Sequence, residues 1–165
     1  MPAKRKTEKC AYMKKILYPG AAAAMLSMTG CVLDSEHTRS LGVGDRLPEF
    51  TIVMSTGDTL STASLAGHTS VITFFSTACE DCRRELPRLQ LAMEQHPNVM
   101  FICIARQESD STIAEFWRSH GLTLPYSPQP DRAIYSLFAE SVIPRIYVSG
   151  PDLVIRETYD ANDIQ

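Results

Sequence analysis

The chain has 165 residues, of which 44% are hydrophobic and 21% charged, and its formal net charge at pH 7 is −3. This length accommodates one domain of ordinary size, and the apolar content excludes an intrinsically disordered chain. The sequence has no run of 20 apolar residues, so it predicts no membrane-spanning helix.

Basic residues are concentrated at the beginning of the chain. Six of the sixteen lysines and arginines precede Ile16, and no lysine occurs from Cys31 onward. From Cys31 the chain holds ten arginines against eighteen carboxylates, a formal net charge of −8. A surface of that sign repels nucleic acid, so we expect no nucleic-acid partner.

Residues 13–31, MKKILYPGAAAAMLSMTGC, have the order of an export signal: a basic start, an apolar stretch, and small residues before a cysteine. The last four, MTGC, resemble a bacterial lipoprotein lipobox, in which the cysteine is acylated and becomes the first mature residue. We therefore predict a lipoprotein-type signal peptide over residues 1–30, with an upstream extension before Met13, and lipidation of Cys31. The alternative, a buried alanine-rich helix, would leave the basic flank without a role.

Lipidation of Cys31 would attach the protein to a membrane through its lipid, with polar residues 31–44 as a tether. The predicted location is extracytoplasmic, as a membrane-anchored lipoprotein facing the periplasm. Thiols there meet an oxidising environment in place of a glutathione-buffered one.

After the tether the chain predicts strands alternating with helices. Residues 49–54 and 59–62 are β-like with turn residues between them, which indicates a hairpin, and residues 64–68 indicate one helical turn. Residues 70–75, SVITFF, are apolar on both faces, which is typical of a central strand covered on both sides.

Apolar residues at helical spacing then predict a helix over residues 80–95, and residues 97–105 predict a second buried strand. Because strand, helix and strand follow in that order, the two strands are expected to be parallel. A second helix is predicted from Asp110, with His120 and Gly121 at its end.

A short strand at 123–127, a third helix at 131–140, and two strands within 142–160 that flank a tight bend complete the pattern. The predicted fold class is α/β: a central mixed sheet flanked by helices, with an N-terminal β-hairpin and an antiparallel hairpin at its end.

Two cysteines, Cys79 and Cys82, fall where the central strand meets the helix. The free N–H groups and the positive end of the helix dipole favour an anion there, and a thiolate is such an anion. A spacing of three in the first turn puts the sulfurs within bonding reach, so Cys82 can expel a substrate from a mixed disulfide on Cys79. We predict that the pair cycles between dithiol and disulfide, with Cys79, the more exposed sulfur, attacking.

Three other interpretations of the pair are half of a zinc site, a purely structural bridge, and coincidence. Half of a zinc site would need further ligands, and the chain offers Cys103 in a predicted buried strand and four scattered histidines. A purely structural bridge over three residues would constrain very little chain. We interpret Cys103 as a buried apolar residue, and we predict no metal and no cofactor other than the redox-active Cys79–Cys82 disulfide.

The stretch FFSTACEDCRRELP, residues 74–87, resembles the active-site segment of the thioredoxin superfamily, and most of all that of membrane-tethered extracytoplasmic reductases of the TlpA/ResA type. The resemblance implies a thioredoxin-like domain over residues 45–165. It implies that Pro144 is a cis-proline facing the disulfide and that the backbone of Ile143 pairs with an extended substrate. The alternative for Pro144 is a trans proline at the start of an edge strand.

The resemblance also implies that Glu85, one helical turn past Cys82, assists proton movement near the sulfurs, whereas the alternative is a solvated helix residue. The chain departs from the family pattern between the cysteines, where it has Glu80 and Asp81. Two carboxylates beside a thiolate destabilise it by charge repulsion, and the two following arginines are expected to offset part of that repulsion.

These features imply a thiol-disulfide oxidoreductase that reduces protein disulfides outside the cytoplasm. The expected partners are protein disulfide substrates, a membrane-embedded or periplasmic electron donor, and the membrane through the lipid anchor. One alternative is a thiol-dependent peroxidase of the peroxiredoxin branch, but the proline expected seven residues before Cys79 is Ile72 here. Another is a copper-binding module of the same fold, which would need a histidine or methionine adjacent to the pair.

Overall fold

The structure, a computed structural model, describes residues 40–163. The predicted signal peptide, Cys31 and most of the tether therefore lie outside the described residues. Within them, no helix is long and apolar enough to cross a membrane.

Five strands form the central sheet in the order β5-β4-β3-β6-β7. β3 (Ser70–Phe75) pairs in parallel with β4 (Met100–Ala105), and β4 pairs in parallel with the short β5 (Tyr126–Ser127). On its other side β3 pairs antiparallel with β6 (Arg145–Ser149), which pairs antiparallel with β7 (Ile155–Asp160). The mixed sheet and its closing hairpin are confirmed.

The predicted N-terminal hairpin is present as a separate two-stranded sheet. β1 (Thr51–Val53) pairs antiparallel with β2 (Thr59–Ser61), and the 3-10 helix η1 (Thr62–Leu65) follows directly. In the turn between the strands, Gly57 has a φ of 89°, a conformation that residues with a side chain rarely adopt.

Helix α1 (Glu80–Gln95) has the bounds that the periodicity predicts, and Pro87 lies inside it. Helix α2 (Asp110–His120) ends where Gly121 adopts a left-handed conformation with a φ of 64°. Helix α3 (Ala133–Ser136) is shorter than the ten residues predicted, and the chain continues after it in turns whose N–H groups donate to the carbonyls of Ile134 and Tyr135.

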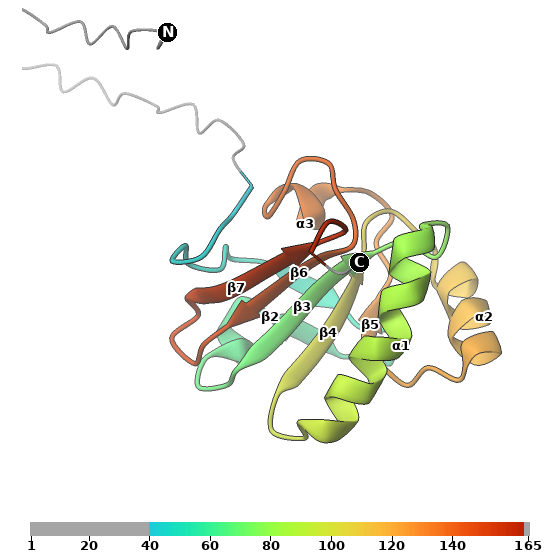
Figure 1. Cartoon of the computed structure of the whole chain (residues 1–165), viewed down its shortest axis with the longest axis horizontal. Helices are drawn as coiled ribbons and strands as arrows, with labels where there is room; N and C mark the ends of the chain where they lie inside the picture. Colours follow the sequence, from blue (N-terminus) through green and yellow to red (C-terminus); the bar gives the residue numbers. More distant parts are fainter. Residues whose placement is uncertain (1–39, 164–165) are drawn as a thin grey trace, which may run out of the picture. The chain divides into compact units, whose positions relative to one another are not determined.

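Side chains of the sheet alternate between two cores, one on each face. From β3, Phe75 joins the core formed with α1 and α2, whereas Ile72 and Phe74 join the core formed with the hairpin, η1 and α3. Figure 1 shows α1 and α2 together on one side of the sheet. β3 is therefore covered on both faces, as the run of apolar residues predicts.

The last residues of the predicted tether bond to the folded domain. The N–H of Leu41 donates to the carbonyl of Phe138 at 2.8 Å, and the N–H of Gly44 donates to the carbonyl of Ile155 at 2.9 Å. The side chain of Leu41 also packs against the core on the hairpin side. Among the described residues of the predicted tether, Leu41 and Gly44 therefore contact the domain.

Candidate active site

Cys79 lies at the N-terminus of α1, four residues after the end of β3. It is the N-cap residue, with an extended backbone (φ −85°, ψ 122°), and its sulfur accepts a hydrogen bond from the backbone N–H of Cys82 at 3.3 Å. An N–H of the first helical turn therefore points at this sulfur, as the position predicts.

The two sulfurs differ in exposure. Cys79 is half-buried and Cys82 is 0% exposed, and both are free thiols in this structure. Burial raises the pKa of Cys82 well above its usual range, and its hydrogen bond with Cys79 raises that pKa further. Cys82 is therefore a protonated thiol at neutral pH, and the prediction that Cys79 is the more exposed sulfur is confirmed.

The loop before β6 brings the second part of the site to Cys79. The peptide bond between Ile143 and Pro144 is cis, and Pro144 is buried directly before β6. The thiol of Cys79 donates to the carbonyl of Ile143 at 3.6 Å. Residues 64 positions apart in sequence thus meet at the sulfur, and the cis bond expected at Pro144 is present.

Glu85 lies one turn after Cys82 on the buried face of α1, and it is only 9% exposed. Burial raises its pKa, although an ion pair with Arg88, 3.3 Å from the carboxylate, opposes the change. Glu85 is thus not the solvated residue of the alternative interpretation. Its role in proton movement stays a prediction.

Sequence analysis did not single out Glu108, which holds the loop that precedes Cys79. The carboxylate of Glu108, in the loop after β4, accepts hydrogen bonds from the N–H of Thr77 at 2.9 Å and from the hydroxyl of Thr77. The Nε of Arg83 donates to the carbonyl of Thr77 at 2.5 Å. The loop is therefore fixed from both sides, by residues that no local motif marks.

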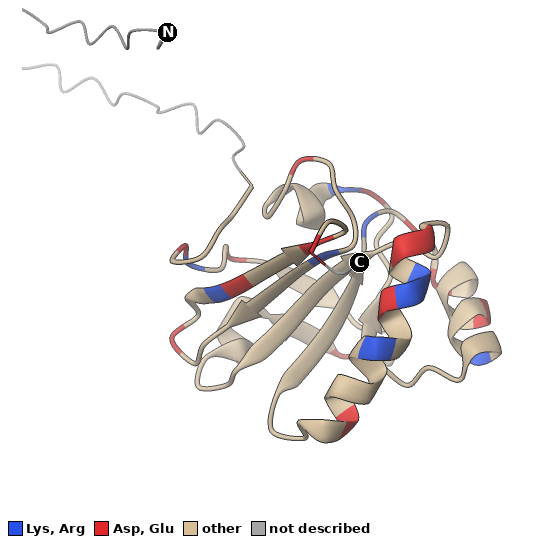
Figure 2. Cartoon of the chain, viewed as in Figure 1, with Lys and Arg blue, Asp and Glu red and all other residues tan. Residues whose placement is uncertain are grey.

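The two arginines after Cys82 behave differently. Arg84 forms an ion pair with Asp81, whereas the guanidinium of Arg83 lies over the ring of Phe116, 5.9 Å from its centroid. Figure 2 shows acidic and basic residues interleaved along α1. Arg84 therefore offsets the charge of Asp81, while Arg83 contributes to the packing of the loop.

The cysteine of the described residues that lies outside the Cys79–Cys82 pair, Cys103, is buried, as predicted. Cys103 is 1% exposed within β4, and burial alone raises its pKa to about 12. Among residues 40–163, no three His, Cys, Asp or Glu side chains gather where they could hold a metal ion. That the protein uses no metal stays a prediction.

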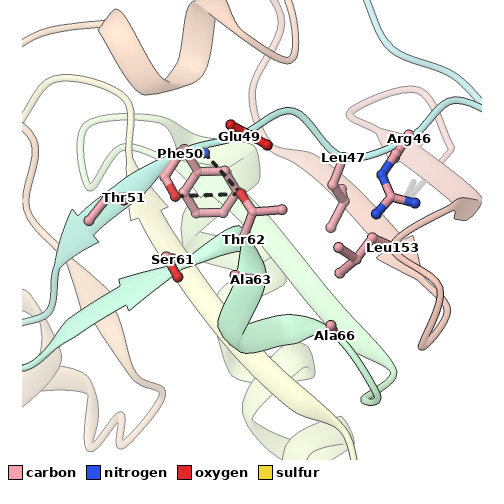
Figure 3. A pocket seen from close by; sticks show the side chains of 10 residues that line it. All are labelled: Arg46, Leu47, Glu49, Phe50, Thr51, Ser61, Thr62, Ala63, Ala66 and Leu153. Atoms are coloured by element: carbon pink, nitrogen blue, oxygen red, sulfur yellow. Dashed lines mark hydrogen bonds between the residues drawn. The ribbon is translucent and has the colours of Figure 1, made fainter.

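A cavity of about 670 Å³ opens beside the N-terminal hairpin (Figure 3). Its lining comes from the segment before β1, from η1 and from the β6–β7 turn, and comprises Arg46, Leu47, Glu49, Phe50, Thr51, Ser61, Thr62, Ala63, Ala66 and Leu153. The hydroxyl of Thr62 accepts from the N–H of Phe50 at 2.9 Å and donates to the carbonyl of Pro48 at 2.7 Å. This hydroxyl therefore links η1 to the segment before β1.

The cavity is separate from the cysteine pair. Leu153 follows Ser149, which pairs with Ser70 at the start of β3, whereas Cys79 follows the end of β3. The two features thus lie at opposite ends of the sheet.

The chain matches the AhpC/TSA family over residues 43–158. It is similar to the thiol-disulfide oxidoreductase ResA of Bacillus subtilis, with 24% identity over 115 residues that cover 68% of this chain and 64% of that protein. It is also similar to ResA of Oceanobacillus iheyensis, with 21% identity over 160 residues that cover 93% of this chain and 82% of that protein. The chain thus spans less than two thirds of the Bacillus subtilis protein.

Solved structures with the same fold include the thioredoxin domain of a thiol-disulfide oxidoreductase from Bacteroides vulgatus. That domain has a TM-score of 0.67 and 17% identity, over 76% of this chain and 94% of that one. A secreted disulfide oxidoreductase of Mycobacterium tuberculosis, homologous to DsbE of E. coli, has a TM-score of 0.60 and 24% identity, over 64% of this chain and 79% of that one. These likenesses show a thioredoxin-like fold. Since the family match spans most of the chain, with both cysteines and the cis-proline loop inside it, the protein belongs to the AhpC/TSA family of thioredoxin-like proteins.

Proposed function

We propose that this protein is a thiol-disulfide oxidoreductase that reduces protein disulfides through Cys79 and Cys82. The observation that carries the proposal is the position of the Cys79 sulfur, between the N–H of Cys82 and the carbonyl of Ile143. An accessible sulfur at a helix N-terminus, with a second sulfur one turn behind it, has the arrangement that dithiol exchange requires. Its curated relatives are named thiol-disulfide oxidoreductases, which supports the same chemistry.

In the first step, the thiolate of Cys79 attacks one sulfur of a partner's cystine. A bond forms between that sulfur and Cys79, the partner's S–S bond breaks, and the other partner sulfur leaves as a thiolate that takes up a proton. The backbone of Ile143 lies beside the reacting sulfur, where an extended partner segment can pair with it.

In the second step, Cys82 loses its proton and attacks the sulfur of Cys79. The intramolecular disulfide forms and the partner's remaining sulfur leaves, so the partner gains two electrons and two protons in total. Burial raises the pKa of Cys82, so this step needs a base. The carboxylate of Glu85, one turn along the same buried face, is the proposed acceptor, and a membrane-embedded or periplasmic donor returns the pair to the dithiol.

The test is reduction of insulin disulfides with dithiothreitol as the electron source. We expect Cys79→Ser to reduce insulin no faster than the background reaction. Cys82→Ser retains the attacking sulfur, so the reduced variant, incubated with insulin in the absence of dithiothreitol, should accumulate a mixed disulfide that mass spectrometry detects. Cys103→Ala is the matched control, because it removes a buried thiol in β4 that is not part of the Cys79–Cys82 pair, and it should keep wild-type activity. Insulin reduction by Cys79→Ser at the wild-type rate would overturn the proposal.

The same variants separate the two alternative functions. A peroxidase would consume hydrogen peroxide with a dithiol donor in a reaction that depends on Cys79, and a copper module would retain copper after desalting in a manner that depends on both cysteines. We expect neither activity to depend on these residues.

We further propose that the domain works outside the cytoplasm, anchored through a lipid on Cys31. The export-type sequence before Cys31 supports this, as does the likeness to an oxidoreductase described as secreted. In bacterial cells grown with a labelled fatty acid, the wild type should be labelled and fractionate with membranes. Cys31→Ala should be unlabelled, and labelling of this variant to the wild-type level would exclude Cys31 as the acceptor.

A further inference from the structure

The loop that carries Ile143 is held by side chains. Within the described part of the chain, residues 140–143 form no backbone–backbone hydrogen bond of their own. Their four consecutive carbonyls instead accept from four side chains: Glu140 from Arg132 at 2.6 Å, Ser141 from Arg106 at 3.0 Å, Val142 from Tyr135 at 2.8 Å, and Ile143 from Cys79 at 3.6 Å. A loop without ladder bonds needs such donors to keep one conformation.

Three of these donors form one unit, which we call the loop clamp: Arg106, Arg132 and Tyr135. The guanidinium carbons of Arg106 and Arg132 lie 5.8 and 5.4 Å from the centroid of the Tyr135 ring, within the range of cation–π attraction. Among residues 40–163, neither arginine forms an ion pair with a carboxylate. The described contacts of the two guanidinium groups are thus with the loop carbonyls and the ring.

The loop clamp is fixed to the strand that leads to the reactive cysteine. Tyr135 is 1% exposed, and its ring meets the ring of Phe74 edge-on, with centroids 5.4 Å apart. The N–H of Arg106 donates to the carbonyl of Phe75 at 2.9 Å. Phe74 and Phe75 are the last two residues of β3, so the clamp ties the loop to the segment from which Cys79 follows.

We propose that Arg106, Arg132 and Tyr135 are positioning residues that hold the loop of residues 140–143 against Cys79 and thereby set the affinity for the disulfide substrate. This inference rests on the proposed function. A partner that pairs with the backbone of Ile143 binds more tightly when that backbone is already fixed, because less conformational entropy is lost on binding. Loss of the clamp should therefore weaken substrate binding and leave the reactivity of the Cys79 thiol unchanged.

The main test compares two buried tyrosines of the same aromatic cluster. Tyr135→Phe removes the hydroxyl that donates to Val142 and keeps the ring, whereas Tyr147→Phe removes a hydroxyl that donates, at 2.9 Å, to the carbonyl of Phe138 outside the loop. For full-length Tyr135→Phe we expect the KM for insulin to rise about fivefold, the effect of one lost hydrogen bond, with kcat unchanged. Tyr147→Phe should keep the wild-type KM, and iodoacetamide should alkylate Cys79 at one rate in all three proteins.

A second pair of variants acts at an exposed position, where folding is not at risk. Arg132→Met removes the donor to Glu140 and keeps the length of the side chain, whereas Arg132→Lys keeps a cationic donor. We expect KM to rise about threefold in Arg132→Met and to return toward the wild-type value in Arg132→Lys.

Backbone order parameters from NMR relaxation give a readout that needs no substrate. For the amides of residues 141–143, we expect order parameters of about 0.85 in the wild type and Tyr147→Phe, and lower order parameters in Tyr135→Phe. Unchanged order parameters in Tyr135→Phe would overturn the inference, and so would equal KM values in Tyr135→Phe and Tyr147→Phe or a parallel fall in alkylation rate. Failure of the proposed function is a different result, namely insulin reduction that survives Cys79→Ser.

Discussion

The sulfur of Cys79 accepts a hydrogen bond from the N–H of Cys82 at 3.3 Å, while the side chain of Cys82 is itself fully buried. The backbone N–H of Cys82 thus donates to the sulfur of Cys79, whereas the thiol of Cys82 lies beneath the protein surface. Under the proposed function, attack on a partner would therefore fall to Cys79 and resolution of the mixed disulfide to Cys82.

This relationship predicts selective alkylation of the reduced protein. At pH 7 iodoacetamide should label Cys79 at least about a hundredfold faster than Cys82, because Cys82 is buried and burial raises its pKa. Peptide mass spectrometry after short exposures measures both rates. Cys103, which is equally buried, is the internal control and should be labelled only after denaturation. Equal rates at the first two cysteines would contradict the assignment.

A second prediction concerns Glu108, whose carboxylate accepts two hydrogen bonds from Thr77. In Glu108→Gln an NH₂ group replaces one acceptor oxygen, so the hydroxyl of Thr77 has to turn and accept in place of donating, and both bonds lose the charge of the carboxylate. We expect the free energy of unfolding to fall by about 1–3 kcal/mol, as for other partly buried bonds to a charged group. Urea unfolding of the reduced proteins measures the change.

The control for Glu108 is Glu115→Gln, which removes the same charge from an exposed position on α2. Its free energy of unfolding should stay within about 0.5 kcal/mol of the wild type. If both variants lose the same stability, the effect comes from net charge and not from the contacts with Thr77.

The regular elements around the site could be predicted because their signals are local. The apolar run of residues 70–75 gives β3 its bounds, and the spacing of apolar residues gives α1 its bounds. α3 is the exception. Apolar residues continue through Phe138 and Ala139, but these side chains reach the core from turns and not from a longer helix.

The site could be predicted only in part. Cys79, Cys82 and the cis bond at Pro144 follow from a short motif and a family resemblance, since each has a fixed place in that pattern. Glu108 and the loop clamp have no such signature, because the tertiary arrangement, in which β4 pairs with β3, brings them to partners distant in sequence. Thr77 and Glu108 are 31 residues apart, and Arg106 and Ser141 are 35 apart.

A third prediction concerns the group that accepts the proton of Cys82. If the carboxylate of Glu85 accepts the proton of Cys82, Glu85→Gln should slow decay of the mixed disulfide at pH 7 by roughly a hundredfold, the usual effect of losing a general base. The initial attack by Cys79 should keep its rate. Rapid acid quenching and mass spectrometry separate the two steps. Glu94→Gln, an exposed change on the same helix, should leave both rates unaltered, and an unaltered decay in Glu85→Gln would remove Glu85 from the mechanism.

A fourth prediction follows from the buried position of the same carboxyl group. Burial raises the pKa of Glu85 in the folded protein above the ordinary value of 4.5, so the folded state binds this proton more tightly than the unfolded state does. The stability it contributes is therefore fully present below the unfolded pKa and is lost as pH rises through the folded pKa. Glu85→Gln cannot titrate, so the free energy of unfolding of the wild type, measured relative to this variant, should fall as the pH is raised from about 4 to about 8. The ion pair with Arg88 limits the size of the fall because it favours the charged form. Urea unfolding of the two reduced proteins across this range measures the free energy of unfolding of the wild type minus that of Glu85→Gln. If this value rises with pH, the Arg88 contact outweighs burial at Glu85.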